Sequence, residues 1–246
     1  MKISDINFSS LNKQEIVEKI FNEFPQKNFP TVITVLDAAS VMRTEVDPWY
    51  KSYLERSEYI FADGYYVYLA AKLLKLDIKE QVTGYDLTDE ILRRSKINNK
   101  KIFFIGAEEE TLNSMLKSIK SIHGEEIIAG SRNGYFKESD LNSIVENIKK
   151  SGADIILVGI GYPKREIFID VAKEKLNHST ILGVGGVFDI LGGKTKRAPK
   201  IFIKTKIEWL YRFILEPKRL WYRVANDYPK FCLKFAKEYF SNALPR

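Results

Sequence analysis

Short apolar runs alternate with longer amphipathic segments along most of this chain. The apolar runs are residues 31–36, 101–106, 126–130, 154–161 and 180–186. Each is short and rich in β-branched residues, as is typical of buried strands. The amphipathic segments, with apolar residues at helical spacing, are residues 65–76, 86–97, 108–122, 138–150 and 164–176. This alternation predicts an α/β fold with a mainly parallel, Rossmann-like sheet flanked by helices.

The pattern changes near residue 200. Beyond this point we find no strand pattern, and the sequence predicts helices over residues 201–215, 217–227 and 229–240. A chain of 246 residues suits one domain with an appendage. We therefore expect an α/β domain over residues 1–199 and a helical appendage, basic and aromatic, over residues 200–246. In such sheets, ligands bind at the carboxyl ends of the strands.

Composition excludes several classes of protein. One cysteine and two histidines cannot make a disulfide scaffold or a zinc site. The sequence has no apolar stretch of the length of a signal peptide or a membrane span, so we expect a cytoplasmic protein. Charged residues make up 29% and hydrophobic residues 45% of the chain, which argues against disorder.

The positive charge is concentrated in the C-terminal part. Residues 194–246 hold 14 Lys and Arg against four acidic residues, a net charge of +10, and 11 of the 31 aromatic residues. This mixture suits an anionic partner with an apolar layer, and nucleic acid and a membrane surface are the two candidates. The spacing of Ile203, Ile207, Leu210 and Ile214 also fits a helix that simply packs on the α/β domain.

An acidic residue, Asp63, follows the apolar run that ends at residue 62 and precedes a predicted helix. An aspartate in this position is commonly a helix N-cap. At the mouth of a parallel sheet it could instead act as a general base that takes a proton from an attacking hydroxyl. Asp37 follows another strand and could share the site, but no Asp-x-Asp pair offers a ligand set for a divalent metal.

Three glycine-containing stretches follow predicted strands. Residues 159–166 place Lys164 and Arg165 at the start of a helix, where cations oppose the helix dipole, and an anionic ligand would explain them. Residues 183–199 combine five glycines with cations, so they could wrap a diphosphate or form a flexible surface turn. Residues 104–110 end in three glutamates, which suit a helix start and would repel an anion.

Several motifs stand out along the chain. They are ADG (62–64), VTGYD (82–86), GYF (134–136), VGIGYPKRE (158–166), GVGGVFD (183–189), KRAP (196–199) and EWLYRFILEPKRLWYR (208–223). Together they resemble the motifs of the WecG/TagA/CpsF glycosyltransferases, the N-acetylmannosaminyltransferase family. The resemblance implies an inverting transfer, without metal or cofactor, of a sugar from a UDP-sugar to a polyprenol-diphosphate-linked saccharide. It further implies peripheral association with the inner face of a bacterial membrane, in surface polysaccharide or teichoic acid synthesis.

The resemblance also assigns roles to residues. Asp63 matches the family's proposed catalytic base, and the basic C-terminal helices are expected to meet the membrane and help close the site. The expected donor- and acceptor-binding residues are Asp37, Gly64, Gly84, Asp86, Gly161, Lys164, Arg165, Glu166, Gly185, Gly186 and Arg197. Residues expected to contact the membrane or a diphosphate are Arg212, Arg219 and Arg223.

The chain departs from the family's usual pattern near the expected donor sugar. Val35 and Asp37 replace the usual Thr and Asn, Tyr66 replaces a Gly, and Arg165 replaces a Gln. These changes leave the donor open, with N-acetylmannosamine and its uronic acid among the candidates. Arg165 could contact a sugar carboxylate or the diphosphate, or pair with Glu166.

Two other classes of function compete with a transferase. They are a nucleotide-binding protein without catalysis and a nucleic-acid-binding α/β protein. The acidic first part of the chain and the glycine loops argue against nucleic acid as the partner. A homo-oligomer is left open.

Overall fold

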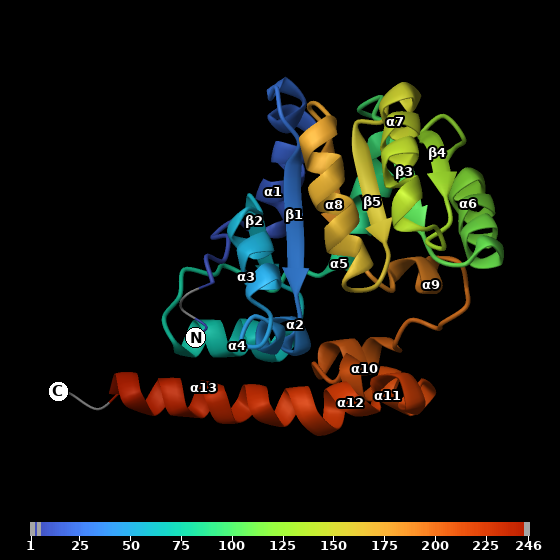
Figure 1. The fold of residues 1–246 in the computed structure, drawn as a ribbon. Helices are drawn as coiled ribbons and strands as arrows, with labels where there is room; N and C mark the ends of the chain where they lie inside the picture. Colours follow the sequence, from blue (N-terminus) through green and yellow to red (C-terminus); the bar gives the residue numbers. More distant parts are fainter. Residues whose placement is uncertain (1–2, 4–5, 244–246) are drawn as a thin grey trace.

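A single parallel sheet forms the centre of the computed structural model, which describes residue 3 and residues 6–243. Within these residues the sheet has six strands in the order β2-β1-β6-β5-β3-β4 (Figure 1). The strands are β1 (Thr31–Leu36), β2 (Tyr59–Ala62), β3 (Ile102–Gly106), β4 (Ile128–Arg132), β5 (Ile155–Gly159) and β6 (Thr180–Gly183). The predicted α/β fold is confirmed, although β4 begins two residues after the predicted strand.

Helices cover both faces of the sheet. One hydrophobic cluster contains residues of α1 (Lys13–Asn22), α5 (Gly84–Ser95), α6 (Glu109–His123) and α9 (Val187–Leu191). The other contains residues of α2 (Ala38–Arg43), α3 (Pro48–Glu55), α4 (Tyr65–Leu73), α7 (Leu141–Ser151) and α8 (Lys164–Lys175). Successive strand residues such as Val32 and Ile33 enter opposite clusters. Burial on both faces explains why the strands are continuously apolar.

Several helices have no counterpart among the predicted segments. They are α1, α2, α3, α9 and the short 3-10 helix η2 (Phe24–Gln26). Helix α9 lies within the glycine-rich stretch because Phe188 is buried there, with its ring centroid 6.1 Å from that of Phe104. The predicted helix over 138–150 begins with a separate 3-10 turn, η3 (Glu138–Asp140), before α7.

The C-terminal layer, defined here as residues 200–243, lies across the carboxyl ends of the strands (Figure 1). Its helices are α10 (Lys200–Lys204), α11 (Glu208–Leu215), α12 (Pro217–Tyr222), the π-helical segment η4 (Arg223–Asp227) and α13 (Tyr228–Ala243). Along the described part of the chain, no helix is both long and apolar enough to cross a membrane.

The helix boundaries in this layer differ from the predicted ones. The predicted helix over 201–215 is interrupted, since Lys206 adopts a positive φ of 63° between α10 and α11. The two later predicted helices follow one another without a break, because η4 joins α12 to α13. This π-helical segment stands just before Pro229, which lacks the N–H that a regular helix would use.

Helix α13 packs against the α/β domain and holds the C-terminal layer in place. Phe231 is buried in the second cluster. Lys234 Nζ lies 3.3 Å from Glu45 Oε2, and Glu238 Oε2 accepts a 2.8 Å hydrogen bond from the backbone N–H of Ile3. The predicted packing of Ile214 is wrong, because this side chain is exposed. Packing comes instead from aromatic residues of α13.

Candidate active site

The two acidic residues, Asp37 and Asp63, follow neighbouring strands. Strands β1 and β2 pair in parallel with Leu36 opposite Ala62, so the next residue of each strand lies at the same edge. The backbone N–H groups of Asp63 and Gly64 both point to the carbonyl oxygen of Leu36, at 3.0 and 3.3 Å. A Cβ on Gly64 would lie 3.5 Å from the Cα of Asp37. The structure therefore brings the two acids together, as predicted.

The side chain of Asp63 points to the start of α5, so the interpretation that it caps the helix that follows it is wrong. Gly64 is the N-cap residue of α4, and no side chain caps that helix. The Oδ1 atom of Asp63 instead accepts a 3.0 Å hydrogen bond from the backbone N–H of Gly84, at the start of α5. Its carbonyl oxygen accepts another from Gln81 Nε2 at 2.6 Å. These contacts fix both the backbone and the carboxylate.

The pKa of Asp63 is raised to about 6. Burial is the main cause, and the negative charges of Asp37 and Glu208 act in the same direction. The hydrogen bond from Gly84 and the charge of Arg212 lower the pKa and offset part of this effect. A carboxylate with this pKa is mostly ionised at pH 7 yet more basic than an ordinary one, which suits a general base.

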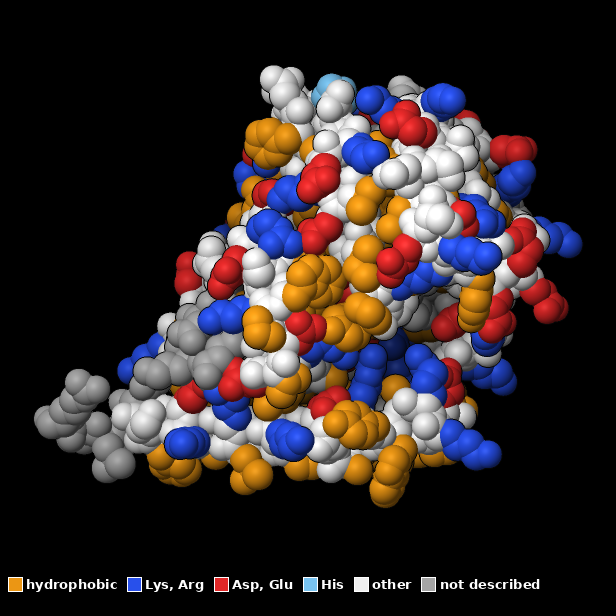
Figure 2. Space-filling view, in the orientation of Figure 1, with side chains coloured by type: hydrophobic (Ala, Val, Ile, Leu, Met, Phe, Trp, Pro, Cys, Tyr) orange, Lys and Arg blue, Asp and Glu red, His pale blue; other side chains and the backbone are white. Residues whose placement is uncertain are grey.

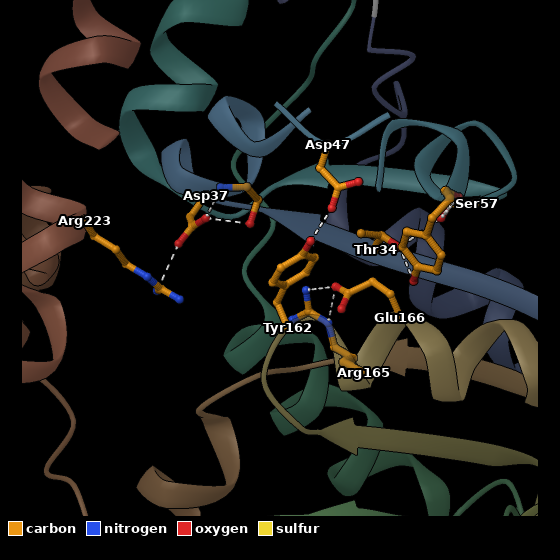
Figure 3. Close-up of polar contacts among 10 residues, drawn as sticks. Thr34, Asp37, Asp47, Ser57, Tyr162, Arg165, Glu166 and Arg223 are labelled. Atoms are coloured by element: carbon orange, nitrogen blue, oxygen red, sulfur yellow. Dashed lines mark hydrogen bonds and ion pairs between the residues drawn. The ribbon is translucent and has the colours of Figure 1, made fainter. Parts of the chain in front are cut away.

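Asp37, by contrast, is an N-cap residue, that of α2. Its Oδ1 atom accepts hydrogen bonds from the backbone N–H and the hydroxyl of Ser40, at 2.8 and 2.7 Å, at the start of α2. Its Oδ2 atom faces Arg223 Nη1 at 3.4 Å (Figure 3). Burial raises the pKa of Asp37, but Arg223, the Ser40 hydrogen bonds and Arg165 outweigh it and hold the pKa below its usual value. Opposite shifts in two adjacent acids are typical of groups with different roles.

Arg165 and Glu166 form a buried ion pair at the same edge of the sheet. Glu166 Oε1 accepts hydrogen bonds from Arg165 Nε at 2.9 Å and from Nη2 at 2.5 Å (Figure 3). A Cβ on Gly185 would lie 3.7 Å from the remaining nitrogen, Nη1. The guanidinium is thus anchored by Glu166 beside the glycine-rich stretch. A contact with a sugar carboxylate or a diphosphate stays a prediction.

Glycines allow the surrounding loops to approach closely. A Cβ on Gly84 would lie 3.4 Å from Val35 Cγ2 and 3.6 Å from Val184 Cα, so α5 begins against the ends of β1 and β6. Gly185 has a positive φ of 53°, and Gly186 is the N-cap residue of α9. Because Gly84 also contacts Asp63, these loops border the two acids.

Other predicted site residues lie apart from the acids or have protein partners. Lys164 Nζ hydrogen-bonds to the carbonyl oxygens of Gly134, at 3.0 Å, and of Phe136, and it lies over the Phe136 ring. These contacts explain a cation at a helix start without a ligand. Gly161 borders open space, and its carbonyl oxygen accepts the N–H of Arg165.

The pair Asp86 and Arg197 connects the glycine-rich stretch to α5. Arg197 Nη2 lies 3.1 Å from Asp86 Oδ1, and the guanidinium stacks 3.6 Å from the centroid of the Tyr85 ring. Both residues are therefore near the start of α5, whose first residue contacts Asp63. Binding of substrate by Arg197 stays a prediction.

The three predicted arginines of the C-terminal layer occupy different places. Arg223 reaches Asp37, and Arg212 pairs with Glu208 at 2.8 Å while its charge acts on Asp63. Arg219 pairs with Glu216 and is exposed. Figure 2 shows a hollow between the α/β domain and the C-terminal layer, with Lys and Arg side chains in it.

Sequence reasoning missed Ser40 and Tyr228. Ser40 orients Asp37, and the spacing of an aspartate three residues before a serine N–H donor at a helix start was the available signal. Tyr228 packs edge-on against Trp209, at 5.6 Å between ring centroids, and burial raises the pKa of its phenol to about 12. Among the described residues, no three His, Cys, Asp or Glu side chains gather as a metal site would require.

Comparison with known proteins assigns this chain to a family. The chain is 28% identical over 243 residues to the N-acetylglucosaminyldiphosphoundecaprenol N-acetyl-beta-D-mannosaminyltransferase of Bacillus spizizenii, covering 99% of this chain and 93% of the relative. Proteins of the same name from Bacillus subtilis and Staphylococcus aureus are 28% and 29% identical, each covering 96% of this chain and 91% of the relative. The profile described as Glycosyl transferase WecG/TagA/CpsF family matches residues 1–244. The chain therefore belongs to the WecG/TagA/CpsF family of glycosyltransferases.

Proposed function

We propose that this glycosyltransferase moves an N-acetylhexosamine-type sugar from a UDP-sugar to a polyprenol-diphosphate-linked saccharide, with Asp63 as the general base. The observation that carries the proposal is the position of Asp63, an acid with a raised pKa at the carboxyl edge of the sheet, beside basic residues of the C-terminal layer. The names of the relatives, which specify an N-acetylglucosaminyl-diphosphoundecaprenol acceptor, support the lipid-linked acceptor.

The proposed reaction is a single displacement. Asp63 takes the proton of an acceptor hydroxyl, whose oxygen attacks the anomeric carbon from the face opposite the diphosphate. The bond from that carbon to the diphosphate oxygen breaks, UDP leaves with the electron pair, and the configuration inverts. The backbone N–H of Gly84 holds Oδ1 of Asp63, and we assign the proton to Oδ2.

The leaving diphosphate needs positive charge as the bond breaks. In our proposal Arg223 and Arg212 supply it, together with Arg165 at the glycine-rich stretch, and no metal ion takes part. Arginine suits this role because its planar guanidinium can hold two phosphate oxygens at once. We also propose that the donor sugar is N-acetylmannosamine, the sugar that the relatives' names specify, or its uronic acid, whose carboxylate would fit a cation close to the acids.

We further propose that the C-terminal layer holds the protein on the inner face of an anionic membrane. This layer exposes Trp221 (64%) and Leu233 (72%) among other apolar side chains, close in sequence to exposed lysines. Figure 2 shows hydrophobic side chains along the lower edge of the layer, with Lys and Arg side chains beside them. Aromatic residues settle at membrane interfaces, and each cation near an anionic surface contributes about 1 kcal/mol. This placement would bring the hollow next to a lipid-linked acceptor.

The test is a transfer assay with a panel of donors. The protein is incubated with a polyprenyl-diphosphate-N-acetylglucosamine acceptor and one UDP-sugar at a time, and the product is identified by mass spectrometry. We expect one added sugar from UDP-N-acetylmannosamine or its uronic acid, with EDTA present. Binding of UDP without transfer from any donor would instead favour a nucleotide-binding protein without catalysis, and transfer abolished by EDTA would contradict the metal-independent step.

A further inference from the structure

The ion pair between Asp37 and Arg223 joins the two parts of the molecule at the candidate site. Asp37 caps α2 of the α/β domain, whereas Arg223 is the first residue of η4 in the C-terminal layer. The contact is a single one at 3.4 Å, and the side chains are 26% and 45% exposed. Ion pairs with this exposure stabilise proteins little. Arg223 can therefore leave Asp37 for a stronger partner.

A pyrophosphate group is such a partner. It carries more negative charge than a carboxylate and can accept two hydrogen bonds from one guanidinium. Arg223 reaches toward Asp37 from the C-terminal layer (Figure 3), and the hollow between the two parts holds further Lys and Arg side chains (Figure 2). A diphosphate that enters this hollow competes with Asp37 for Arg223.

The departure of Arg223 would change the surroundings of Asp63. The charged and titratable groups that act on Asp63 come from three neighbouring elements and are Asp37, Glu208, Arg212 and Tyr228. Those that act on Asp37 are Arg223, Arg165, Asp63, Tyr50 and Tyr228. Arg223 thus compensates a carboxylate that lies beside the candidate base. Without that compensation, the charge of Asp37 disfavours the ionised form of Asp63 more strongly.

We propose that Asp37 is a positioning residue that holds Arg223 before the substrate binds and releases it to the pyrophosphate of the substrate, after which the negative charge of Asp37 strengthens Asp63 as a base. The inference rests on the proposed function, in which Asp63 accepts the proton. It gives a reason for a carboxylate at position 37, where an amide would cap α2 equally well. The enzyme then becomes most basic when its substrate is bound.

The variant Asp37→Asn tests the proposal because asparagine keeps the N-cap and removes the charge. UDP no longer competes with a carboxylate for Arg223, so we expect its Kd, measured by calorimetry, to fall by about two- to fivefold. The pKa of the Asp63 carboxyl, followed by NMR with 13C-labelled aspartate, should fall, and kcat should decrease a few-fold. Tighter binding with slower turnover is not the signature of a purely structural residue.

Two further variants control the experiment. Asp47 also caps a helix, accepting the N–H of Tyr50 at 3.1 Å, and Asp47→Asn should change neither UDP affinity nor the titration of Asp63. Arg223→Gln should weaken UDP binding. In the Arg223→Gln background, Asp37→Asn should tighten UDP binding less than it does in the wild type.

Three results would overturn the inference. They are weaker or unchanged UDP binding in Asp37→Asn, an unchanged pKa of Asp63 in that variant, and an equal effect of Asp37→Asn in both Arg223 backgrounds. UDP affinity and the Asp63 titration require neither acceptor nor turnover. If the expected changes in UDP affinity and in the pKa of Asp63 occur but no sugar is transferred, only the proposed function is refuted. If sugar is transferred but these changes do not occur, only the release of Arg223 from Asp37 to the pyrophosphate is refuted.

Discussion

Arg165→Gln should destabilise the protein strongly, because it leaves a buried charge without its partner. Glu166 is 0% exposed and the Arg165 side chain 13%, and two hydrogen bonds join them. Removing one partner of such a pair costs about 3–5 kcal/mol. For a chain of this size, each kcal/mol lowers Tm by roughly 2–4 °C, so we expect a decrease of about 6–20 °C.

Denaturant unfolding measures this effect against a matched control. Arg56 pairs with Asp170 at 2.7 Å, but these side chains are 46% and 27% exposed, so Arg56→Gln should cost no more than about 1 kcal/mol. The double variant Arg165→Gln/Glu166→Gln should recover most of the lost stability, since it leaves no unpaired buried charge.

The reasoning is refuted if Arg165→Gln is no more destabilising than Arg56→Gln. The pair with Glu166 would then stabilise the protein no more than an exposed pair does. Kinetics test the ligand contact separately: in Arg165→Gln, KM for an acidic UDP-sugar should rise far more than KM for a neutral one if Arg165 contacts the sugar carboxylate, and both should rise alike if it contacts the diphosphate.

Three other outcomes are expected. The folded-state pKa of Asp63 is about 6, above its ordinary value of 3.8, so ionisation of Asp63 opposes folding. Asp63→Asn should therefore raise the free energy of unfolding by up to about 3 kcal/mol at pH 8. This gain in stability should disappear as the pH falls through 6 to below 4. Replacing Trp221 and Leu233 with glutamate should reduce sedimentation of the protein with anionic vesicles. The control Ile122→Glu, at an exposed position on α6, should not reduce it. Equal sedimentation of all variants would show that the C-terminal layer does not bind the membrane. Gly106→Ala should lower the free energy of unfolding by about 2 kcal/mol or more, because Gly106 has a φ of 147° and a Cβ there would lie 2.3 Å from the Gly159 carbonyl oxygen. The control Gly161→Ala, whose new Cβ would meet no atom within 4 Å, should unfold like the wild type.

The sheet and the meeting of the two acids could be predicted because they depend on local pattern and on a general rule. Apolar runs of strand length marked β1 and β6, and Asp37 directly after β1 marked the edge of the sheet. Strand β2 is not among the predicted strands, but Asp63 stands directly after its short apolar run. Parallel pairing then brings these carboxyl ends together, whichever helices cover the faces.

The partners of the cations could not be predicted, because they depend on the path of the chain. Arg223 meets a residue 186 positions away, and Lys164 meets backbone carbonyls of another loop. The interruption at Lys206, which has a positive φ of 63°, and the continuous helix through Pro229 also depart from the local helix signals. Sequence spacing carries no information about such contacts.

The most direct test of the central claim is the pH dependence of transfer by the wild type and by Asp63→Asn. In the wild type, kcat/KM should fall on the acid side with a pKa of about 6. Asp63→Asn should still bind UDP but lower kcat by roughly 10²- to 10⁴-fold and lose that acid limb, because its amide cannot take a proton. A variant that keeps its kcat, or that keeps the same acid limb, would contradict the assignment of Asp63 as the general base.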